Sequence, residues 1–461
     1  MAFYIATHAP TADECLRDAQ VTDERESGSA RRFRRASIAI AVSFLLLSAP
    51  LLHAAEPPLT LAEALRLAGS DSRQLVAQEA AVTAASELAI SAGERPDPIL
   101  KLGVDNLPIT GPDRFRIGAD FMTMRRIGVM QEFTSSDKLD LRRMRGESEA
   151  ERERVAKQGI LANLQRDTAL AWIDRYFADQ QRALLDEQVR EARLAVDGAA
   201  IAYRTGRGSQ ADIVTARAAI VMLEDRQLQI ERQQRVSTLQ LARWIGSAAE
   251  RPALSPPDWA TPALGVHDAS QAVGHTLSRH PMLTMLAAQE STAQLDSKIA
   301  QAAKRPDWTW ELSFAQRGSG YSNMISLGVS IPLVIAPSRR QDRDIAAKNA
   351  LIDQLQAQRE DLLRVHTTEL RVMQAEWASF GQRIKRIDES LIPLAAERTS
   401  AANIAYRSGT GMLTAVLDAR KNEIDVRMQR LDLEREQARV WAQLTYLIPS
   451  ETAISSKDSR K

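Results

Sequence analysis

The order of hydrophobic and polar residues divides the chain into long helical stretches and short strand-like stretches. Helical patterns run from Leu59 to Glu94, from Asp137 to about Tyr203 and from Ser270 to Lys304. Within the long stretches, apolar residues recur at heptad-like spacing: Leu170, Ile173, Phe177 and Leu184, and later Leu363, Leu370 and Trp377. As one helix, the stretch that ends near Tyr203 would be about 100 Å long. The pattern predicts long helices that pack as coiled coils, with a kink at Pro393 in the last of them.

Four shorter stretches alternate apolar and polar residues with the period of two that is typical of β-strands. Their apolar members are Leu100, Leu102 and Val104; Phe115, Ile117, Ala119 and Phe121; Trp308, Trp310, Leu312 and Phe314; and Ile325, Leu327, Val329, Ile331 and Leu333. Each stretch has one apolar face and one charged or small face. We therefore expect two hairpins with strands of about 9–11 residues, which is long enough to cross an outer membrane at a tilt.

The two halves of the chain resemble each other. IAYRTGRGSQADIVTAR at 201–217 shares eight of 17 positions with IAYRSGTGMLTAVLDAR at 404–420. AGERPDPILKLGV at 92–104 resembles AAKRPDWTWELSF at 302–314. The offsets, 203 and 210 residues, differ by only a loop's length. In each half a helical stretch ends at Arg-Pro-Asp, strands follow, and a long helical stretch comes last, which indicates an internal duplication.

This duplication predicts the domain organisation. A first repeat covers 56–247, with strands at about 98–134 and a helical hairpin at about 137–247. A second repeat covers 269–449, with strands at about 307–334 and a helical hairpin at about 338–448. Between them lies a linker, 248–268, whose four prolines cannot continue a helix, and a polar tail, 450–461, ends the chain.

Residues 1–55 are predicted to be an N-terminal extension and a secretory signal peptide. Four arginines at 31–35 precede an uncharged run from Ala36 to Ala55, which Pro50 interrupts. A transmembrane anchor is the alternative, but an anchor usually needs about 20 continuous apolar residues. Cys15, the only cysteine, precedes this run, so a processed chain would have neither a disulfide nor a lipid-anchor cysteine.

Composition narrows the function further. Aromatic residues make up 5% of the 461 residues and charged residues 26%, which suits long helices better than a compact mixed fold. The formal net charge is +1, so the chain has no basic surface for nucleic acid. After residue 55 we find no run of about 18 apolar residues, and we expect no transmembrane helix.

The strand-like stretches raise the question of what closes their sheet. In a bilayer each unpaired backbone group costs several kcal/mol, and about eight strands make the smallest closed barrel. If these four strands cross a membrane, they must share a barrel with other copies of the chain. Half-buried sheets in a soluble domain are the alternative, and the export signal and the duplicated hairpins favour the membrane.

With these features the chain resembles the TolC-type outer-membrane efflux channels from Leu59 to about Ile448. The paired Tyr-Arg-x-Gly segments carry the resemblance, as do IGVMQEF at 127–133 and LGVSIPL at 327–333, which are similar to the family's passage from strand to helix. The resemblance implies a mainly α fold with membrane β, built from two structural repeats that each hold a β-hairpin and a long coiled-coil helical hairpin. It also implies a homotrimer that shares a twelve-stranded β-barrel and an α-helical periplasmic tunnel. AWIDRYFADQ at 171–180 and LARWIGS at 241–247 are most similar to the branch that serves heavy-metal cation pumps.

The resemblance places the Tyr-Arg-x-Gly segments at the periplasmic tips of the helical hairpins, where an adaptor protein docks. The tip residues are Tyr203, Arg204, Gly206 and Gly208, and Tyr406, Arg407, Gly409 and Gly411. We expect the tyrosines and arginines to be exposed beside a bare backbone. A structural turn alone also explains the glycines. Both segments contain Gly-x-Gly, but neither follows a strand, so a nucleotide site is not indicated.

By the same resemblance, Asp212 and Asp418 belong to the entrance gate. Asp212 matches a position that ties the closed entrance by hydrogen bonds across helices. Asp418 matches one of two acidic positions that ring the entrance, and the other is Ala415 here. Arg204 and Arg407 are candidates to pair with the aspartates as a latch. A solvated helix face is the alternative for either aspartate.

We predict no enzyme activity, no catalytic residue, no resident metal and no cofactor. Of the six histidines, His8 and His53 precede the mature chain, and His275 and His280 are five residues apart, on different faces of a helix. The carboxylates alternate with arginine and lysine along helices, as they do on solvated coiled coils.

The sequence thus predicts the exit duct of a tripartite efflux system in the outer membrane of a Gram-negative bacterium, with a large periplasmic portion. It would passively conduct solute, with heavy-metal cations as the expected cargo. The expected partners are two further copies, outer-membrane lipid, a periplasmic adaptor (a membrane fusion protein) and an RND-type inner-membrane pump. The alternatives are a channel for drugs or exported proteins and a non-channel coiled-coil scaffold of the envelope.

Overall fold

The computed structural model describes residues 58–253, 256–257, 259 and 277–449. The signal segment 1–55, the tail 450–461 and most of the predicted linker therefore lie outside the described residues. All elements discussed below belong to one unit, Pro57–Lys461.

The first half of this unit contains two short helices, two strands and two long helices. In chain order these are α1 (Leu61–Asp71), α2 (Arg73–Ala92), β1 (Ile99–Asp105), β2 (Met124–Phe133), α3 (Ser136–Arg204) and α4 (Gln210–Ile245). A 3-10 turn at Gly246–Glu250 follows α4. The 69 residues of α3 form one helix of about 100 Å, as its pattern predicts.

The second half has the same order with one interruption. It contains α6 (Pro281–Ala302), β3 (Trp308–Gln316), β4 (Met324–Ser330), α7 (Gln341–Arg386), α8 (Ile392–Arg407) and α9 (Leu413–Thr445). A 3-10 turn at Pro337–Arg339 precedes α7, and a π-helical turn at Ile387–Leu391 separates α7 from α8. The irregularity predicted at Pro393 is present, because this proline has no N–H and its ring displaces the carbonyl of Glu389.

Two of the shorter helices differ from their predicted extents. The stretch from Leu59 to Glu94 is broken at Ser72, whose side chain accepts a hydrogen bond from Leu75 N and so caps a new helix. In the stretch from Ser270 to Lys304, residues 277–278 are helical, and a break at 279–280 precedes α6, which begins at Pro281 with His280 as its cap. Caps of this kind end one helix and start another without changing the spacing of the apolar residues. For this reason the hydrophobic pattern did not reveal them. In the part of the chain that the structure describes, no helix is long and apolar enough to cross a membrane.

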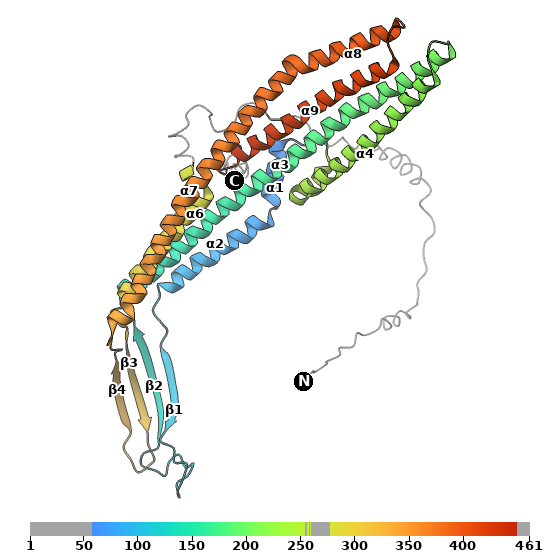
Figure 1. Cartoon of the computed structure of the whole chain (residues 1–461). Coiled ribbons are helices and arrows are strands. Elements are labelled where there is room, and N and C mark those ends of the chain that lie inside the picture. The colour runs from blue at the N-terminus through green and yellow to red at the C-terminus, as the bar shows by residue number, and fades with distance from the viewer. Residues whose placement is uncertain (1–57, 254–255, 258, 260–276, 450–461) are drawn as a thin grey trace, which may run out of the picture. The chain divides into compact units, whose positions relative to one another are not determined.

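The four strands form one antiparallel sheet in the order β1-β2-β3-β4. Pairing of β2 with β3 joins the two halves of the chain. Figure 1 shows the strands at one end of the long helices and the helix-to-helix turns at the other. β4 ends at Ser330 rather than near Leu333, because Pro332 cannot donate to a ladder.

One predicted strand is wrong. Residues 114–121, whose alternation predicted the second strand, lie in the loop between β1 and β2, and the second strand is Met124–Phe133. In the loop, Arg114 N donates to Gly111 O and Phe115 N donates to Pro108 O, so the backbone forms turns instead of pairing with a strand. The alternation of apolar and polar residues at 114–121 therefore belongs to an exposed loop and not to a paired strand.

The pairing register gives the sheet one apolar face and one polar face. On the apolar face three rows cross the strands: Leu102, Ile127, Phe314 and Ile325; Leu100, Val129, Leu312 and Leu327; and Gln131, Trp310 and Val329. No described element covers this face, since Leu102 and Ile325 are 70% and 75% exposed. On the polar face, Lys101 pairs with Glu311 at 2.6 Å. A contiguous apolar surface of this kind usually marks contact with a partner or a membrane.

The main core of the helical part surrounds Trp172. This α3 residue is fully buried with Phe177, Leu241 and Ala442 in a cluster that also draws on α1. Its indole N–H donates to Leu59 O at 3.1 Å. The predicted heptad positions on α3 are buried or half-buried, as expected, whereas Leu363 on α7 is 42% exposed, contrary to its heptad assignment.

Candidate functional site

Each Tyr-Arg-x-Gly segment forms the same turn between two helices. After α3, Gly206 has a φ of 71°, Gly206 N donates to Tyr203 O (3.1 Å) and Arg207 N donates to Ala202 O (2.9 Å). After α8, Gly409 has a φ of 77° and the two equivalent bonds measure 3.1 and 3.0 Å. This is the Schellman arrangement, in which glycine adopts a left-handed conformation that other residues avoid.

The second glycine of each turn is required for a different reason. A Cβ on Gly208 would lie 3.1 Å from the Cβ of Ala202, and a Cβ on Gly411 would lie 2.9 Å from that of Ala405. Because the chain returns so close to the preceding helix, only glycine fits without displacement. Turn geometry thus explains all four glycines, and the Gly-x-Gly spacing does not indicate a phosphate site.

The two turns present different side chains. Tyr203 is 49% exposed, as expected for a docking surface. Tyr406 instead packs against Ala199 and Leu413, and its hydroxyl is buried without a hydrogen-bond partner. The expectation that both tyrosines are exposed is therefore wrong for Tyr406. Arg204 and Arg407 are exposed at the ends of α3 and α8.

Asp212 has a local partner at the start of α4. Its Oδ2 accepts hydrogen bonds from the N and the Oγ of Ser209, both at 2.8 Å, while Ser209 Oγ accepts from Asp212 N at 3.2 Å. This reciprocal capping box satisfies backbone donors of the first turn. Among the described residues of one chain, Asp212 makes no hydrogen bond to another helix.

Asp418 lies exposed on α9, one turn beyond Ala415 on the same face. Within the described residues of one chain it has no ion pair, and neither Arg204 nor Arg407 pairs with an aspartate. The latch expected between these arginines and aspartates is therefore not formed within a protomer.

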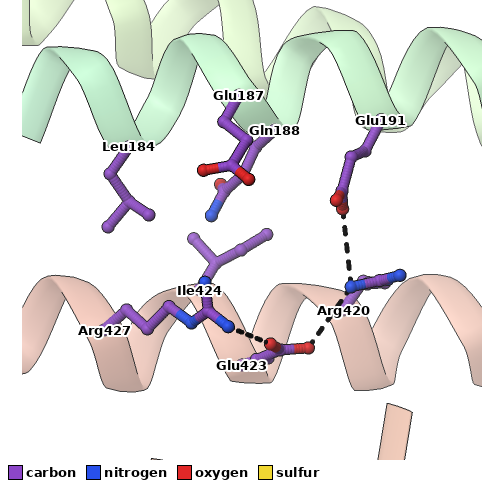
Figure 2. A pocket seen from close by; sticks show the side chains of 8 residues that line it. All are labelled: Leu184, Glu187, Gln188, Glu191, Arg420, Glu423, Ile424 and Arg427. Atoms are coloured by element: carbon purple, nitrogen blue, oxygen red, sulfur yellow. Dashed lines mark hydrogen bonds and ion pairs between the residues drawn. The ribbon is translucent and has the colours of Figure 1, made fainter. Parts of the chain in front are cut away.

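Farther from the turns, α3 and α9 face each other across a polar cavity of about 120 Å³ (Figure 2). Glu423 on α9 is 6% exposed and forms ion pairs with Arg427 at 2.7 Å and with Arg420 at 3.5 Å. Arg420 also reaches Glu191 on α3 at 3.5 Å, so it joins the first helical hairpin to the second. The side chain of Gln188 is buried in the same cavity, and its Oε1 has no hydrogen-bond partner.

Sequence reasoning missed this contact because acid–base alternation along a helix usually marks a solvated face. Polar links of the same kind recur between the hairpins. Arg226 on α4 pairs with Asp425 on α9 at 2.7 Å, and Gln181 on α3 donates to Asp432 at 2.8 Å. The hairpins thus meet through these polar links as well as through apolar clusters such as Leu185, Ile230 and Met428.

The Arg-Pro-Asp motif of the second half has a defined role where the sheet meets the helices. Lys138, at the start of α3, is 6% exposed and pairs with Asp307 of the motif at 2.8 Å. The same ammonium group also donates to the carbonyl of Arg305. This buried cation fixes the start of β3 against the first turn of α3. The repetition of Arg-Pro-Asp in the two halves was the signal that could have drawn attention to Asp307, although from the sequence the motif was interpreted only as a helix end.

The histidines form no metal site in the described part of the chain, where no group of three or more His, Cys, Asp or Glu residues is suitably placed. His280 contacts His366 instead, with ring centroids 4.2 Å apart, and His366 Nδ1 lies 2.8 Å from a carboxylate oxygen of Glu369. His280 Nδ1 accepts a hydrogen bond from Met282 N, which requires that nitrogen to be unprotonated. Burial, together with the neighbouring His366, lowers the pKa of His280 to about 4.

His280 should make the stability of the folded chain depend on pH. Its pKa falls from 6.5 to about 4 on folding, so protons bind the unfolded chain more readily below pH 6.5. Stability from this group is complete above that value and is lost progressively as the pH falls toward 4. Asparagine is a good helix cap without a titrating group. His280→Asn should therefore reduce the drop in thermal unfolding midpoint between about pH 7 and pH 4, and an unchanged drop would contradict this assignment.

No family model matches the chain, and no characterised protein matches it in sequence. Solved structures do match. The outer-membrane channel OprN has a TM-score of 0.69 and 16% identity, over 85% of this chain and 90% of that one. CusC, a protein that changes conformation as it folds and forms a transmembrane channel, has a TM-score of 0.72 and 16% identity, over 85% of this chain and 92% of that one. The outer membrane protein VceC of Vibrio cholerae has a TM-score of 0.67 and 16% identity, over 84% of this chain and 95% of that one. The chain therefore has the fold of the TolC-type outer-membrane efflux channels.

Proposed function

We propose that this chain is an outer-membrane channel protein and forms the exit duct of a tripartite efflux system. The observation that carries the proposal is the uncovered apolar face of the four-stranded sheet, with its rows centred on Leu312 and Leu327. A lipid environment stabilises such a face, whereas water does not. The fold shared with outer-membrane channels supports the same conclusion.

The ends of the apolar face have the composition of a membrane band. At the helix end, Phe133 and Trp308 stack with ring centroids 4.7 Å apart. At the loop end, the outermost row holds Arg125 and Gln316 beside Val104. From Arg125 to Phe133 the strand rises by about 26 Å, close to the apolar band of about 25 Å in outer-membrane barrels.

Three copies would complete the channel. Within one chain β1 and β4 are edge strands with one unpaired side each, and a lipid environment does not tolerate open edges. Three sheets joined edge to edge give a closed barrel of twelve strands, and the helical hairpins then continue it as a tunnel. Exposed apolar residues at heptad spacing on α4, namely Val214, Val221 and Leu228, offer a seam for a neighbouring copy.

The proposed partners and cargo follow from the tripartite arrangement. The tip turns with Tyr203, Arg204 and Arg407 are the surface for a periplasmic adaptor, and an inner-membrane pump supplies the solute. Heavy-metal cations are the proposed cargo, and a resident metal site is not required for passive conduction. Asp418 from three copies would place negative charge at the entrance and favour cations there.

The gate can be tested through charge alone. Asp212→Asn keeps an oxygen for the bond from Ser209 N, so the helix cap is retained while the charge is lost. If Asp212 and Arg407 of neighbouring copies hold the entrance closed, Asp212→Asn and Arg407→Gln should each raise single-channel conductance in a planar bilayer. Asp418 is not part of this latch, so Asp418→Asn should change cation selectivity more than conductance. Equal conductance in the wild type and both latch variants would remove these residues from the gate.

The proposed function is tested by where the mature protein is found and in what state. We expect it in the outer-membrane fraction, released only by detergent, with the mass of three chains. An envelope scaffold made of coiled coils would be released without detergent. Release without detergent would overturn the channel assignment, because the apolar face of the sheet would then have to be covered by protein and not by lipid.

A further inference from the structure

The two loops beyond the far end of the sheet form one folded unit. They are the β1–β2 loop, 106–123, and the β3–β4 loop, 317–323. Arg317 Nε donates to Phe121 O at 2.9 Å, and the rings of Phe121 and Tyr321 lie 6.4 Å apart. The loops touch so closely that a Cβ on Gly318 would lie 2.4 Å from Gly118 O. These contacts hold the two loops together, so the side chains on their surface have defined positions.

This surface carries arginines without carboxylate partners. Among the described residues, Arg114, Arg116, Arg125 and Arg317 form no ion pair. Arg126, one position along β2 and on the polar face, pairs with Asp105 at 3.1 Å and Glu311 at 3.7 Å. The acids of the same loop, Asp113 and Asp120, form no ion pair with these arginines among the described residues, and Asp120 accepts a hydrogen bond from Met122 N. Unpaired guanidinium groups thus gather at one end of the sheet.

The Arg114-Phe115-Arg116 segment is held in an uncommon conformation. Phe115 has a φ of 58°, and its N–H donates to Pro108 O at 2.8 Å. The ring is 58% exposed, and the guanidinium of Arg114 lies 4.8 Å from its centroid. A large side chain seldom adopts a positive φ, and such strain is frequent where a residue is held for function. The segment thus presents an exposed aromatic ring with the Arg114 cation beside it.

Arg125 connects this segment to the lipid-facing side of the sheet. The register places it in one row with Val104 and Gln316, on the same face as Ile127 and Val129. It is the outermost charged residue of that face, and its side chain is exposed. An arginine there reaches the level at which lipid headgroups begin.

We propose that Arg114, Arg116 and Arg125, with the exposed ring of Phe115, bind the phosphate groups of lipids in the outer leaflet. Guanidinium groups form bidentate hydrogen bonds with phosphate oxygens, and aromatic rings are stable at the boundary between headgroups and acyl chains. The inference rests on the proposed function, which places the helices in the periplasm and these loops at the outer surface. Such a site would bind anionic lipid headgroups specifically, which the apolar face of the sheet alone does not do.

The test uses the full-length mature protein, purified in a neutral detergent. Native mass spectrometry measures the retention of lipid A with both phosphates and of lipid A with its phosphates removed, so the acyl chains are identical. The site variant is Arg114→Gln/Arg116→Gln/Arg125→Gln. Its matched control, Arg190→Gln/Arg217→Gln/Arg232→Gln, removes the same charge from exposed helical arginines that have no ion pair among the described residues. A third variant replaces the three site arginines with lysine.

The wild type should retain the phosphorylated lipid more strongly than the dephosphorylated one. The site variant should lose about 100-fold in apparent affinity, since each arginine near an anionic lipid contributes about a factor of five. The helical control should behave like the wild type. The lysine variant should fall between them, because it keeps the charge and loses the bidentate geometry.

Three results would overturn the inference. In the first, both lipids bind the wild type equally. In the second, inorganic phosphate displaces the lipid, which would make free phosphate the ligand. In the third, the glutamine variant loses its trimeric mass, which would assign the arginines to contacts between copies. Failure of the proposed function gives a different outcome, in which neither lipid is retained by any variant.

Discussion

Leu327→Arg should prevent assembly of the membrane form, whereas Ser326→Arg should leave it intact. The two residues are neighbours on β4, but alternation places them on opposite faces of the sheet. Leu327 is 73% exposed in the middle row of the apolar face, opposite Leu312. Arginine at the midplane of an outer-membrane barrel costs about 2–4 kcal/mol, and the proposed trimer would carry that cost three times. Ser326 shares its row with Lys101, Gly128 and Ser313 on the polar face, where a further charge can be solvated.

The measurement is the fraction of each variant recovered as a detergent-resistant trimer from the outer membrane. We expect almost none for Leu327→Arg and a wild-type amount for Ser326→Arg. If the sheet were simply solvated on both faces, an exposed leucine and an exposed serine would tolerate arginine equally. Equal recovery of the two variants would therefore contradict the lipid-facing assignment.

Trp172→Ala should cause the largest loss of stability in the helical part. The ring is fully buried in the main core, and truncation of a buried tryptophan removes about 3–5 kcal/mol. It also leaves Leu59 O without the indole N–H that now lies 3.1 Å away. Because Leu59 N donates to Pro252 O, loss of the ring should loosen the attachment of the first described residues to the segment after α4.

Two comparisons separate the causes of this effect. Trp172→Phe keeps most of the volume but loses the hydrogen bond and part of the ring, so we expect about 2 kcal/mol. Trp244→Ala removes a half-buried tryptophan at the edge of the same core, with the Arg243 guanidinium 4.6 Å from its ring, and should have a smaller effect than Trp172→Ala. The midpoint of thermal unfolding followed by circular dichroism should rank the variants in that order. A drop for Trp244→Ala as large as that for Trp172→Ala would argue against a core centred on Trp172.

Elements with an uninterrupted pattern could be predicted closely from the sequence. α3 has no proline and a steady apolar spacing, and its bounds, Ser136–Arg204, agree with the predicted stretch within a residue. A kink at Pro393 could be predicted because proline acts on the backbone directly, whereas its form, a π-helical turn before the proline, could not. Ser72 could not, because a serine cap and an exposed serine have the same periodicity.

Side-chain roles at the candidate site were harder to predict. The two Tyr-Arg-x-Gly segments have the same backbone, yet Tyr203 is exposed and Tyr406 packs against the other hairpin. Glu423 belongs to a run of charges that indicates solvent, although it is buried and lines the cavity between α3 and α9. In both cases the burial of the side chain depends on which helix packs against it. The similarity between the two repeats does not reveal which helix that is.

The central claim is that copies of this chain form a channel through a membrane. Planar-bilayer recording of the purified protein, with the Arg407→Gln variant in parallel, tests it most directly. We predict discrete current steps of uniform size, larger in the variant if the entrance is closed at rest. Current that stays at the level of the bare bilayer with both proteins, at amounts that give detergent-resistant trimers, would contradict the account.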